Sequence, residues 1–393
     1  MSFDNHHYTA TTLTEADIVE WSEFCAKCFS YKVNPPSSRY FQNHFFNDPR
    51  RDASLIHVMR HVGPKNNEQL TSVSSEIVSS VRIFKREVSL GRKGAVMMAG
   101  GIGEVCTHID HQRKGLAKRL LQIALNNIQE DNAFKMVVSI LHASPQLTRV
   151  YESSAGYKHV VSHWSVLSFA PPSSKFSDNV EYMDKTQIRI RLAKFPEDTV
   201  RLQQIHEDYS QNRLAGCIIR TPEYWNEYLS KEIGDSLFVL TVEESIVAWM
   251  SIRTRSERRF QLREYGIVNS TTLEEMELTH TEIFTMLLER AFMQHESSTM
   301  TTSTSYSLQD TIELQLPTFV LKELQEPCLY DHNNKTAPWI DFYNPMIYSE
   351  DDHGWMYKPL QQTNSTFEKD NQTNIFDIVE NGVPHLIWPS DSF

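Results

Sequence analysis

A short glycine-containing turn between a strand pattern and a helix pattern constrains the fold of this chain most strongly. The string GGIGEVCTHIDHQRKGLAKRLLQIAL ends an apolar run of strand type at residues 95–107 and then changes period. Its apolar residues next recur at three-to-four spacing, which predicts an amphipathic helix of about 18 residues. Backbone N–H groups and the helix dipole at such a helix start suit a pyrophosphate. This turn consists of Gln112, Arg113, Lys114, Gly115, Leu116 and Ala117.

Strand and helix patterns continue on both sides of this turn. Turn signals at residues 64–67 and 91–94 separate runs rich in Val, Ile and Met, so an antiparallel meander is expected before the turn. Thr14 and Asp17 form a capping pattern for a helix. The expected strands cover residues 54–62, 77–85, 95–107, 134–141 and the end of 157–169, and further helices cover residues 13–29 and 144–154.

The whole chain is too long for one hydrophobic core. A length of 393 residues predicts two or three domains. The Pro/Ser-rich stretch at residues 171–179 is the best linker. After it, helices are expected at residues 198–210 and 221–233, strands at 236–242, 246–254 and 262–268, and a long helix at 273–294, without a counterpart of the turn. The last residues are apolar, including Trp388 and Phe393, so the C-terminus is expected to dock on the fold. The predicted division is residues 1–170, a linker at 171–179, residues 180–360 and a returning segment at 361–393.

Charge and cysteine content limit the partners. The chain has 38 Lys plus Arg against 50 Asp plus Glu, a formal charge of −12, which disfavours nucleic acid and anionic membranes and favours a cationic acceptor. No apolar run reaches membrane-spanning length, and five scattered cysteines favour a reduced protein of the cytoplasm, with the nucleus as the alternative. Cys25 and Cys28 form a C-x-x-C without a second pair, so no metal is expected. Homo-oligomerisation stays open.

With the string YESSAGY at residues 151–157, the turn resembles the GNAT superfamily of acetyltransferases. Its members carry [RQ]-x-x-G-x-[GA] after their fourth strand and a Tyr-containing helix ending in Gly-Phe or Gly-Tyr. The resemblance covers about residues 13–169 and implies acetyl-CoA as co-substrate, with the pyrophosphate at residues 112–117. It implies further that a strand edge pairs with the pantetheine arm at Val105, Cys106 and Thr107. Ile109 stands where many members have Pro, and Gln112 replaces the commoner Arg.

A narrower similarity is to multi-domain Eis-type acetyltransferases and to fungal lysine acetyltransferases. It rests on VRIFKREVSLG, GGIGEVCTH and QRKGLA, and on Arg213, Leu214 and Trp225 in the second half. The implied fold is of the α/β (α+β) class. A mixed central sheet with a splayed strand pair is followed by a second GNAT-like domain and a docked C-terminal segment.

Acetyl transfer to an amine needs a base and a proton donor. An alkylammonium with a pKa near 10.4 is mostly protonated at pH 7, so exposing its lone pair costs about 4 to 5 kcal/mol. The resemblance implies Tyr151 as the donor to the departing thiolate, although Gly156 follows it by five residues instead of the usual four. Three base candidates stay open: Glu104 on the strand before the turn, His142 after the next strand, and the terminal carboxylate of Phe393, which the Eis resemblance suggests.

Three functions remain at this point. The first is acetyl-CoA-dependent N-acetylation of a primary amine on a small cationic molecule such as lysine or a polyamine. The second is acetylation of a protein lysine. The third is an interaction protein that binds CoA without catalysis, which the altered Tyr151 spacing keeps open.

Overall fold

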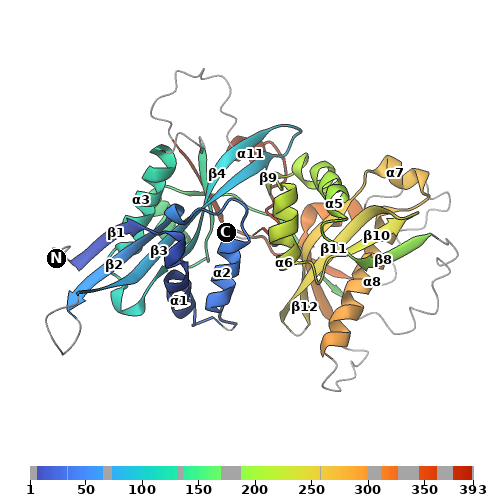
Figure 1. Cartoon of the computed structure of the whole chain (residues 1–393). Coiled ribbons are helices and arrows are strands. Elements are labelled where there is room, and N and C mark those ends of the chain that lie inside the picture. The colour runs from blue at the N-terminus through green and yellow to red at the C-terminus, as the bar shows by residue number, and fades with distance from the viewer. Residues whose placement is uncertain are drawn as a thin grey trace.

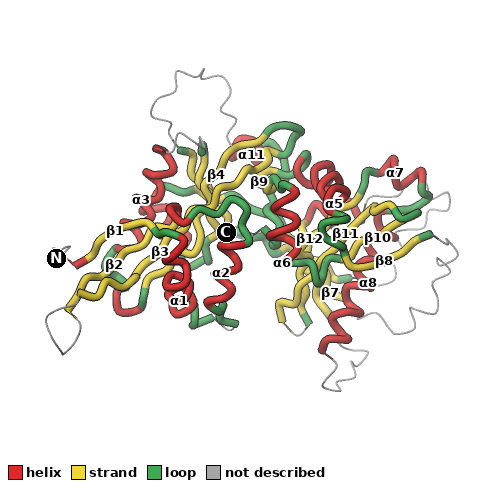
Figure 2. The backbone as a smooth tube through the Cα atoms, in the orientation of Figure 1, coloured by secondary structure: helices red, strands yellow, loops and turns green. Residues whose placement is uncertain are grey.

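The chain forms two β-sheets that lie beside each other, with helices on their faces (Figures 1 and 2). The computed structural model describes residues 7–32, 34–64, 73–130, 136–169, 187–256, 258–299, 311–325, 345–360 and 375–391. The predicted linker at residues 171–179 and the terminal Phe393 lie outside these ranges.

The first sheet contains the predicted meander. Its order is β1 (Tyr8–Thr12), β2 (Ile56–Pro64), β3 (Val73–Leu90), β4 (Val96–Thr107), β5 (Val138–His142), β15 (Trp355–Pro359) and β6 (Lys158–His159), and β9 (Ala215–Ile218) pairs with β3. β2, β3 and β4 are antiparallel neighbours, as predicted. β1 was not predicted, because five residues of mixed polarity give no clear period.

Strands β4 and β5 form the expected splayed pair. They run parallel and pair from Ala99 with Val138 to Ile102 with Leu141. β4 continues to Thr107, whereas β5 ends at His142. Glu104 lies beyond the last paired residue, in a bulge where the β3–β4 register shifts, and its φ of 51° is in the left-handed region.

The second sheet repeats this order strand by strand. It runs β8 (Ile188–Leu192), β10 (Phe238–Val242), β11 (Ser245–Ser256), β12 (Arg259–Ile267), β13 (Ile312–Pro317), β7 (Trp164–Phe169) and β14 (Met346–Ser349). β12 and β13 are parallel, like β4 and β5, and the other neighbours are antiparallel. The second GNAT-like unit expected from the sequence is therefore present.

Each sheet also contains a strand from the other half of the chain. β15 lies between β5 and β6 of the first sheet, and β7 lies between β13 and β14 of the second. Strand pairing therefore crosses the predicted domain boundary in both directions. β7 comes from the predicted first domain but pairs in the second sheet, and β15 comes from the predicted second domain but pairs in the first. The proposed division into residues 1–170 and 180–360 describes the order of elements but not the two sheets.

Helices cover both faces of the first sheet (Figure 2). The apolar side of α3 packs on one face with residues of β3, β4 and β5, and α1 and α2 pack with β2 on the other. Thr14 N–H donates to Asp17 before α1, as the capping pattern predicts. The helices are α1 (Ile18–Cys28), α2 (Ser38–Phe46), α3 (Leu116–Glu130), α4 (Thr148–Ala155), α5 (Thr199–His206), α6 (Ser230–Glu232), α7 (Ser270–Glu275), α8 (His280–Thr299), α9 (Thr318–Gln325) and α11 (Ile375–Glu380).

The structure changes two sequence expectations in the second half. The single helix predicted at residues 273–294 is two helices, α7 and α8, because Glu277 adopts a φ of 54° between them. The helix predicted at residues 221–233 has a wider π-helical turn at Tyr224–Leu229.

The C-terminal segment docks, as expected. Leu386 and Trp388 join the core of the second sheet, and Trp388 Nε1 donates to Ser210 Oγ at 3.1 Å. His385 contacts the first half through Ser162 Oγ, at 2.6 Å from its Nδ1. Residues 375–391 therefore bridge both halves.

Candidate active site

The turn before α3 presents a row of backbone donors. Arg113 and Gly115 have φ values of 61° and 74°, and this alternation turns successive amides toward one side. Gly115 takes this conformation without strain, since it has no Cβ. Within the described ranges, the amides of residues 113–117 donate no hydrogen bond, and the first turn of α3 contains no acidic residue. Five consecutive N–H groups at a helix start can therefore receive a pyrophosphate.

Side chains fix the position of this turn. Gln112 Nε2 donates to the carbonyl of Thr107 at 3.2 Å, which ties the turn to the end of β4. Lys114 Nζ donates to the hydroxyl of Tyr8 on β1 at 3.0 Å. Arg113 is exposed, and the buried Leu116 packs in the core beneath α3. The amides of the turn thus face outward, and these contacts hold the start of α3 in place behind them.

The end of β4 carries the strand edge expected for the pantetheine arm. Beyond Ile102 this edge has no register partner on β5 in the described chain. Val105 packs on the α3 side, and Thr107 Oγ1 lies 2.8 Å from Ser79 Oγ of β3. The side chain of Cys106 points to the opposite core beside Cys25, and burial raises the pKa of both thiols. An extended ligand chain can therefore pair with the backbone here.

Glu104 points into a buried network on the face opposite α3. Its Oε1 lies 2.8 Å from His44 Nδ1 of α2, and its Oε2 accepts from Arg82 Nη1 at 3.4 Å. Arg82 also contacts Asp48, whose two oxygens accept from Arg86 at 3.1 and 3.0 Å. Burial alone would raise the pKa of Asp48, but the two guanidinium groups outweigh it and lower this pKa.

Aromatic rings enclose the Glu104 and His44 pair. Tyr40 stacks on the His44 ring at a centroid distance of 5.8 Å, and the guanidinium of Arg82 lies over Phe84 at 4.1 Å. Tyr228 contributes a ring 5.8 Å from His44, and this residue comes from the second half of the chain. A carboxylate with 5% of its side chain exposed thus lies against the Arg82 guanidinium, the His44 imidazole and aromatic rings.

Tyr151 lies on α4, on the α3 side of the sheet. It packs against the core around α3 and stands edge-on to Tyr157 at 6.2 Å. Burial raises the pKa of Tyr151 to about 12, so its phenol is neutral at pH 7 and can donate a proton. The α4 helix ends at Gly156, whose φ of 73° forms the C-cap.

His142 and the end of the described tail lie in other settings. His142 ends β5, is 45% exposed, and pairs through Nε2 with Asp352 at 3.0 Å beside β15. The described chain ends at Asp391, which accepts from Arg220 Nη2 at 2.8 Å and from the Tyr224 hydroxyl at 3.1 Å. Arg86 of the first-half network lies 5.5 Å from the Tyr224 ring, so the tail approaches that network.

His44, Arg82 and Asp48 were missed by sequence reasoning. A signal existed for one of them, since Arg82 and Arg86 are four positions apart in the strand run VRIFKRE and therefore share one strand face. His44 and Asp48 lie on α2 and just beyond it, in a helix that the sequence analysis did not predict.

Comparisons with known proteins agree with this geometry. Residues 9–160 match the model of an acetyltransferase (GNAT) domain. A GCN5-related N-acetyltransferase from Anabaena variabilis aligns at 13% identity over 90% of this chain and 73% of that chain, with a TM-score of 0.53. One from Kribbella flavida aligns at 14% identity over 90% of this chain and 71% of that chain, with a TM-score of 0.51.

Other comparisons add less. Eis1 from Mycobacterium abscessus aligns at 13% identity over 90% of this chain and 73% of that chain, with a TM-score of 0.47. No curated protein matches the sequence. None of the helices in the described part of the chain has the length and apolarity that crossing a bilayer requires. Residues 9–160 therefore match a GNAT acetyltransferase domain, and the splayed pair of β4 and β5 lies within these residues.

Proposed function

We propose that this protein transfers acetyl from acetyl-CoA to a primary amine of a small cationic molecule such as lysine or a polyamine. The observation that carries the proposal is the row of free amides at residues 113–117, next to an unpaired strand edge at residues 105–107. The amides suit the pyrophosphate of CoA, and the strand edge suits its pantetheine arm.

Glu104 is the base that the geometry favours. It lies on β4 two residues beyond the last pair with β5, where the thioester would meet the acceptor, and its bulge directs the side chain away from α3. An ammonium acceptor is attracted to a buried carboxylate, and His44 can share the proton that Glu104 accepts. The amine nitrogen then forms a C–N bond with the acetyl carbon as the C–S bond to CoA breaks.

Tyr151 is proposed to donate its phenolic proton to the departing thiolate. Its position on the α3 side of the sheet, opposite Glu104, supports this role, because donor and acceptor substrates then approach from opposite faces. His142 is the weaker base candidate, because its Nε2 atom is already paired with the carboxylate of Asp352.

Two features support a small acceptor in preference to a protein lysine. Tyr228 lies against His44, and Tyr224, which donates to Asp391 of the tail, lies beside Arg86, so the second half packs on the network where we propose the acceptor to bind. The net charge of −12 attracts a cation. The terminal carboxylate of Phe393 stays a base candidate, because the described tail leads toward this region.

The test is thiol release from acetyl-CoA with a panel of lysine, polyamines and a lysine-containing peptide. Turnover with the free amines supports the proposal, and turnover with the peptide alone would make the acceptor a protein. A flat response with intact acetyl-CoA affinity would leave a CoA-binding protein. A tag appended after Phe393 tests the terminal carboxylate, which is excluded as the base if turnover is unchanged.

A further inference from the structure

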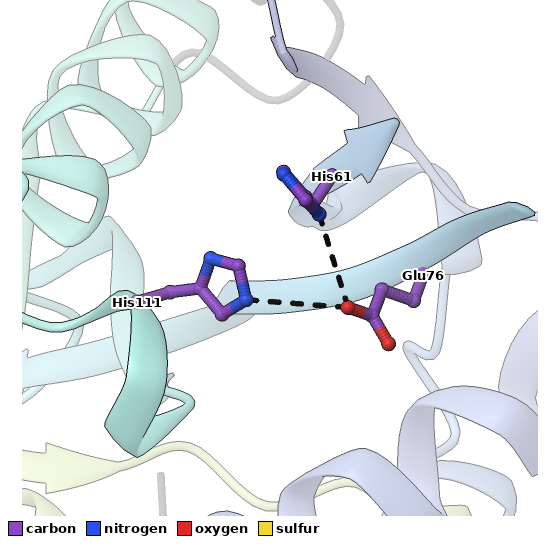
Figure 3. A group of neighbouring side chains, drawn as sticks. All are labelled: His61, Glu76 and His111. Atoms are coloured by element: carbon purple, nitrogen blue, oxygen red, sulfur yellow. Dashed lines mark ion pairs between the residues drawn. The ribbon is translucent and has the colours of Figure 1, made fainter. Parts of the chain in front are cut away.

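Two histidines and a glutamate meet beside the phosphate-binding turn (Figure 3). His61 comes from β2, Glu76 from β3, and His111 from the short turn at Ile109–His111 that leads into Gln112. One ligand atom from each lies within 4.8 Å of the others. Glu76 Oε1 is 3.9 Å from His61 Nδ1 and 4.0 Å from His111 Nε2.

Sequence spacing could not reveal this cluster. The nearest pair is 15 positions apart along the chain, and a metal motif is recognised by ligands at short, regular spacing. The β2–β3 pairing brings the first two together, since His61 stands directly opposite Glu76 in the register. The turn after β4 then adds His111 over the same edge.

The donor set is one that transition metals prefer. Two imidazole nitrogens and one carboxylate form the protein ligands of many zinc sites that keep a further position for water. Zinc requires nitrogen and oxygen donors at about 2.0 to 2.2 Å, so the three ligand atoms must move closer to one another by roughly an ångström. Glu76, with 64% of its side chain exposed, has room for this rotation.

A neighbour already orients one ligand. The Tyr8 hydroxyl lies 3.0 Å from His111 Nδ1, and Lys114 Nζ donates to the same hydroxyl at 3.0 Å. With Nδ1–H donating to the Tyr8 oxygen, the lone pair of His111 resides on Nε2, the atom that faces Glu76. Ligating histidines in metal sites are held by this kind of outer hydrogen bond.

We propose that His61, Glu76 and His111 bind one divalent transition-metal ion, with Zn²⁺ as the expected ion. The ion joins β2 and β3 to the segment that enters the turn at Gln112, so it holds the phosphate-binding turn against the sheet. The proposal does not depend on the acetyl-transfer reaction.

Metal binding is measured directly on the full-length, untagged protein. After chelator treatment and buffer exchange, Co²⁺ is added and the visible absorption of its d–d bands is followed, because these bands report nitrogen and oxygen coordination. We expect saturation at one equivalent, and Zn²⁺ should displace the signal at one equivalent. Zn²⁺ should also raise the Tm in a concentration-dependent way.

Variants assign the ligands. His61→Ala, Glu76→Gln and His111→Ala should each abolish the one-equivalent Co²⁺ signal and the Zn²⁺-dependent rise in Tm. His163→Ala is the matched control, since His163 forms another surface pair, with Asp351 at 3.0 Å, and its loss should leave both readouts unchanged. Glu76→Gln keeps the test sound if a histidine variant folds poorly, because Glu76 is exposed.

Two results would overturn the proposal. The first is a wild-type protein that shows no saturable Co²⁺ signal. The second is a signal that survives both His61→Ala and His111→Ala in folded protein.

Discussion

The two sheets share one strand order but differ at the helix that follows their fourth strand. After β4, the five amides of residues 113–117, which run into the first turn of α3, have no hydrogen-bond acceptor in the described chain. After β12, Asn269 Oδ1 accepts from Thr272 N–H at the start of α7, and Glu282 accepts from Thr279 N–H before α8. The starts of α7 and α8 are therefore capped by nearby side chains, whereas the start of α3 leaves its amides to a ligand in the described chain.

The two halves also differ in what surrounds a buried glutamate, Glu104 in the first half and Glu264 in the second. Glu104 lies in the β4 bulge, and Glu264 lies next to a register shift between β11 and β12. Both contact a buried arginine, Arg82 or Arg220. Ser390 and Asp391 of the C-terminal segment also contact Glu264 or its arginine, so the tail occupies this place in the second half. The same strand order thus holds a candidate active site in the first half, whereas in the second half the corresponding place anchors the C-terminal segment.

The largest expected effect, on kcat, distinguishes Glu104 from Glu264. Glu104→Gln should lower kcat by about 1000-fold, since general-base catalysis contributes about 100- to 10,000-fold. Acetyl-CoA affinity should be kept, because Glu104 lies on the face opposite α3. Steady-state kinetics and calorimetric CoA binding measure the two quantities.

Glu264→Gln is the matched control for this prediction. It places the same substitution next to a bulge of the second sheet, at a carboxylate that pairs with Arg220, and should leave kcat of the folded protein within about twofold because distant sites act independently. Equal losses of kcat in both variants would mean that Glu104 acts only through folding.

The next largest effect, on CoA affinity, distinguishes the start of α3 from the start of α7. Ala117→Glu should weaken CoA binding by about 100-fold, because a carboxylate near the pyrophosphate costs a few kcal/mol at an effective dielectric near 20. Thr271→Glu puts the same charge into the first turn of α7 and should leave CoA affinity unchanged. Equal affinities of both variants would rule out the turn as the phosphate site.

A smaller effect concerns the proton donor. Tyr151→Phe should lower kcat by about tenfold, which is modest because a thiolate leaves readily without full protonation. Tyr157→Phe is the control, since the Tyr157 hydroxyl lies 2.6 Å from Ser139 Oγ and serves packing. It should lower the free energy of unfolding by about 1 kcal/mol and leave kcat unchanged. A kcat for Tyr151→Phe equal to that of the wild type would remove Tyr151 from the mechanism.

The smallest effect is a pH dependence of stability that arises in the second half. Burial raises the pKa of Glu264 from 4.5 to about 7. A raised folded-state pKa contributes stability that is present below the unfolded pKa and lost as the pH rises through the folded one. The free energy of unfolding should therefore fall by about 1 kcal/mol between pH 6 and 8.5. Urea unfolding at both pH values should show a smaller fall in Glu264→Gln, and parallel falls would contradict this origin.

Local patterns in the sequence predicted the meander, α3 and the turn, because each depends on neighbours within a few residues. The side on which Glu104 lies could not be predicted. Strand alternation allowed either face, and the bulge with its positive φ decides the direction. The partners of Glu104 were also hidden, since His44 is 60 positions away in a helix whose aromatic residues gave no clear period.

Long-range pairing was beyond prediction for the same reason. Asp352, the partner of His142, is 210 positions away, and nothing near either residue indicates that β15 enters the first sheet. The cluster of His61, Glu76 and His111 likewise forms because sheet register and one turn bring three separated residues together.

The exchange of β7 and β15 has a consequence for synthesis on the ribosome. The gap between β5 and β6 is filled by residues 355–359, near the end of the chain. The first sheet therefore cannot be completed while the second is still being made, although domains usually fold as units during synthesis. The last strands of the two sheets, β14 (Met346–Ser349) and β15 (Trp355–Pro359), are neighbours in the sequence, so both sheets receive their last strand almost together.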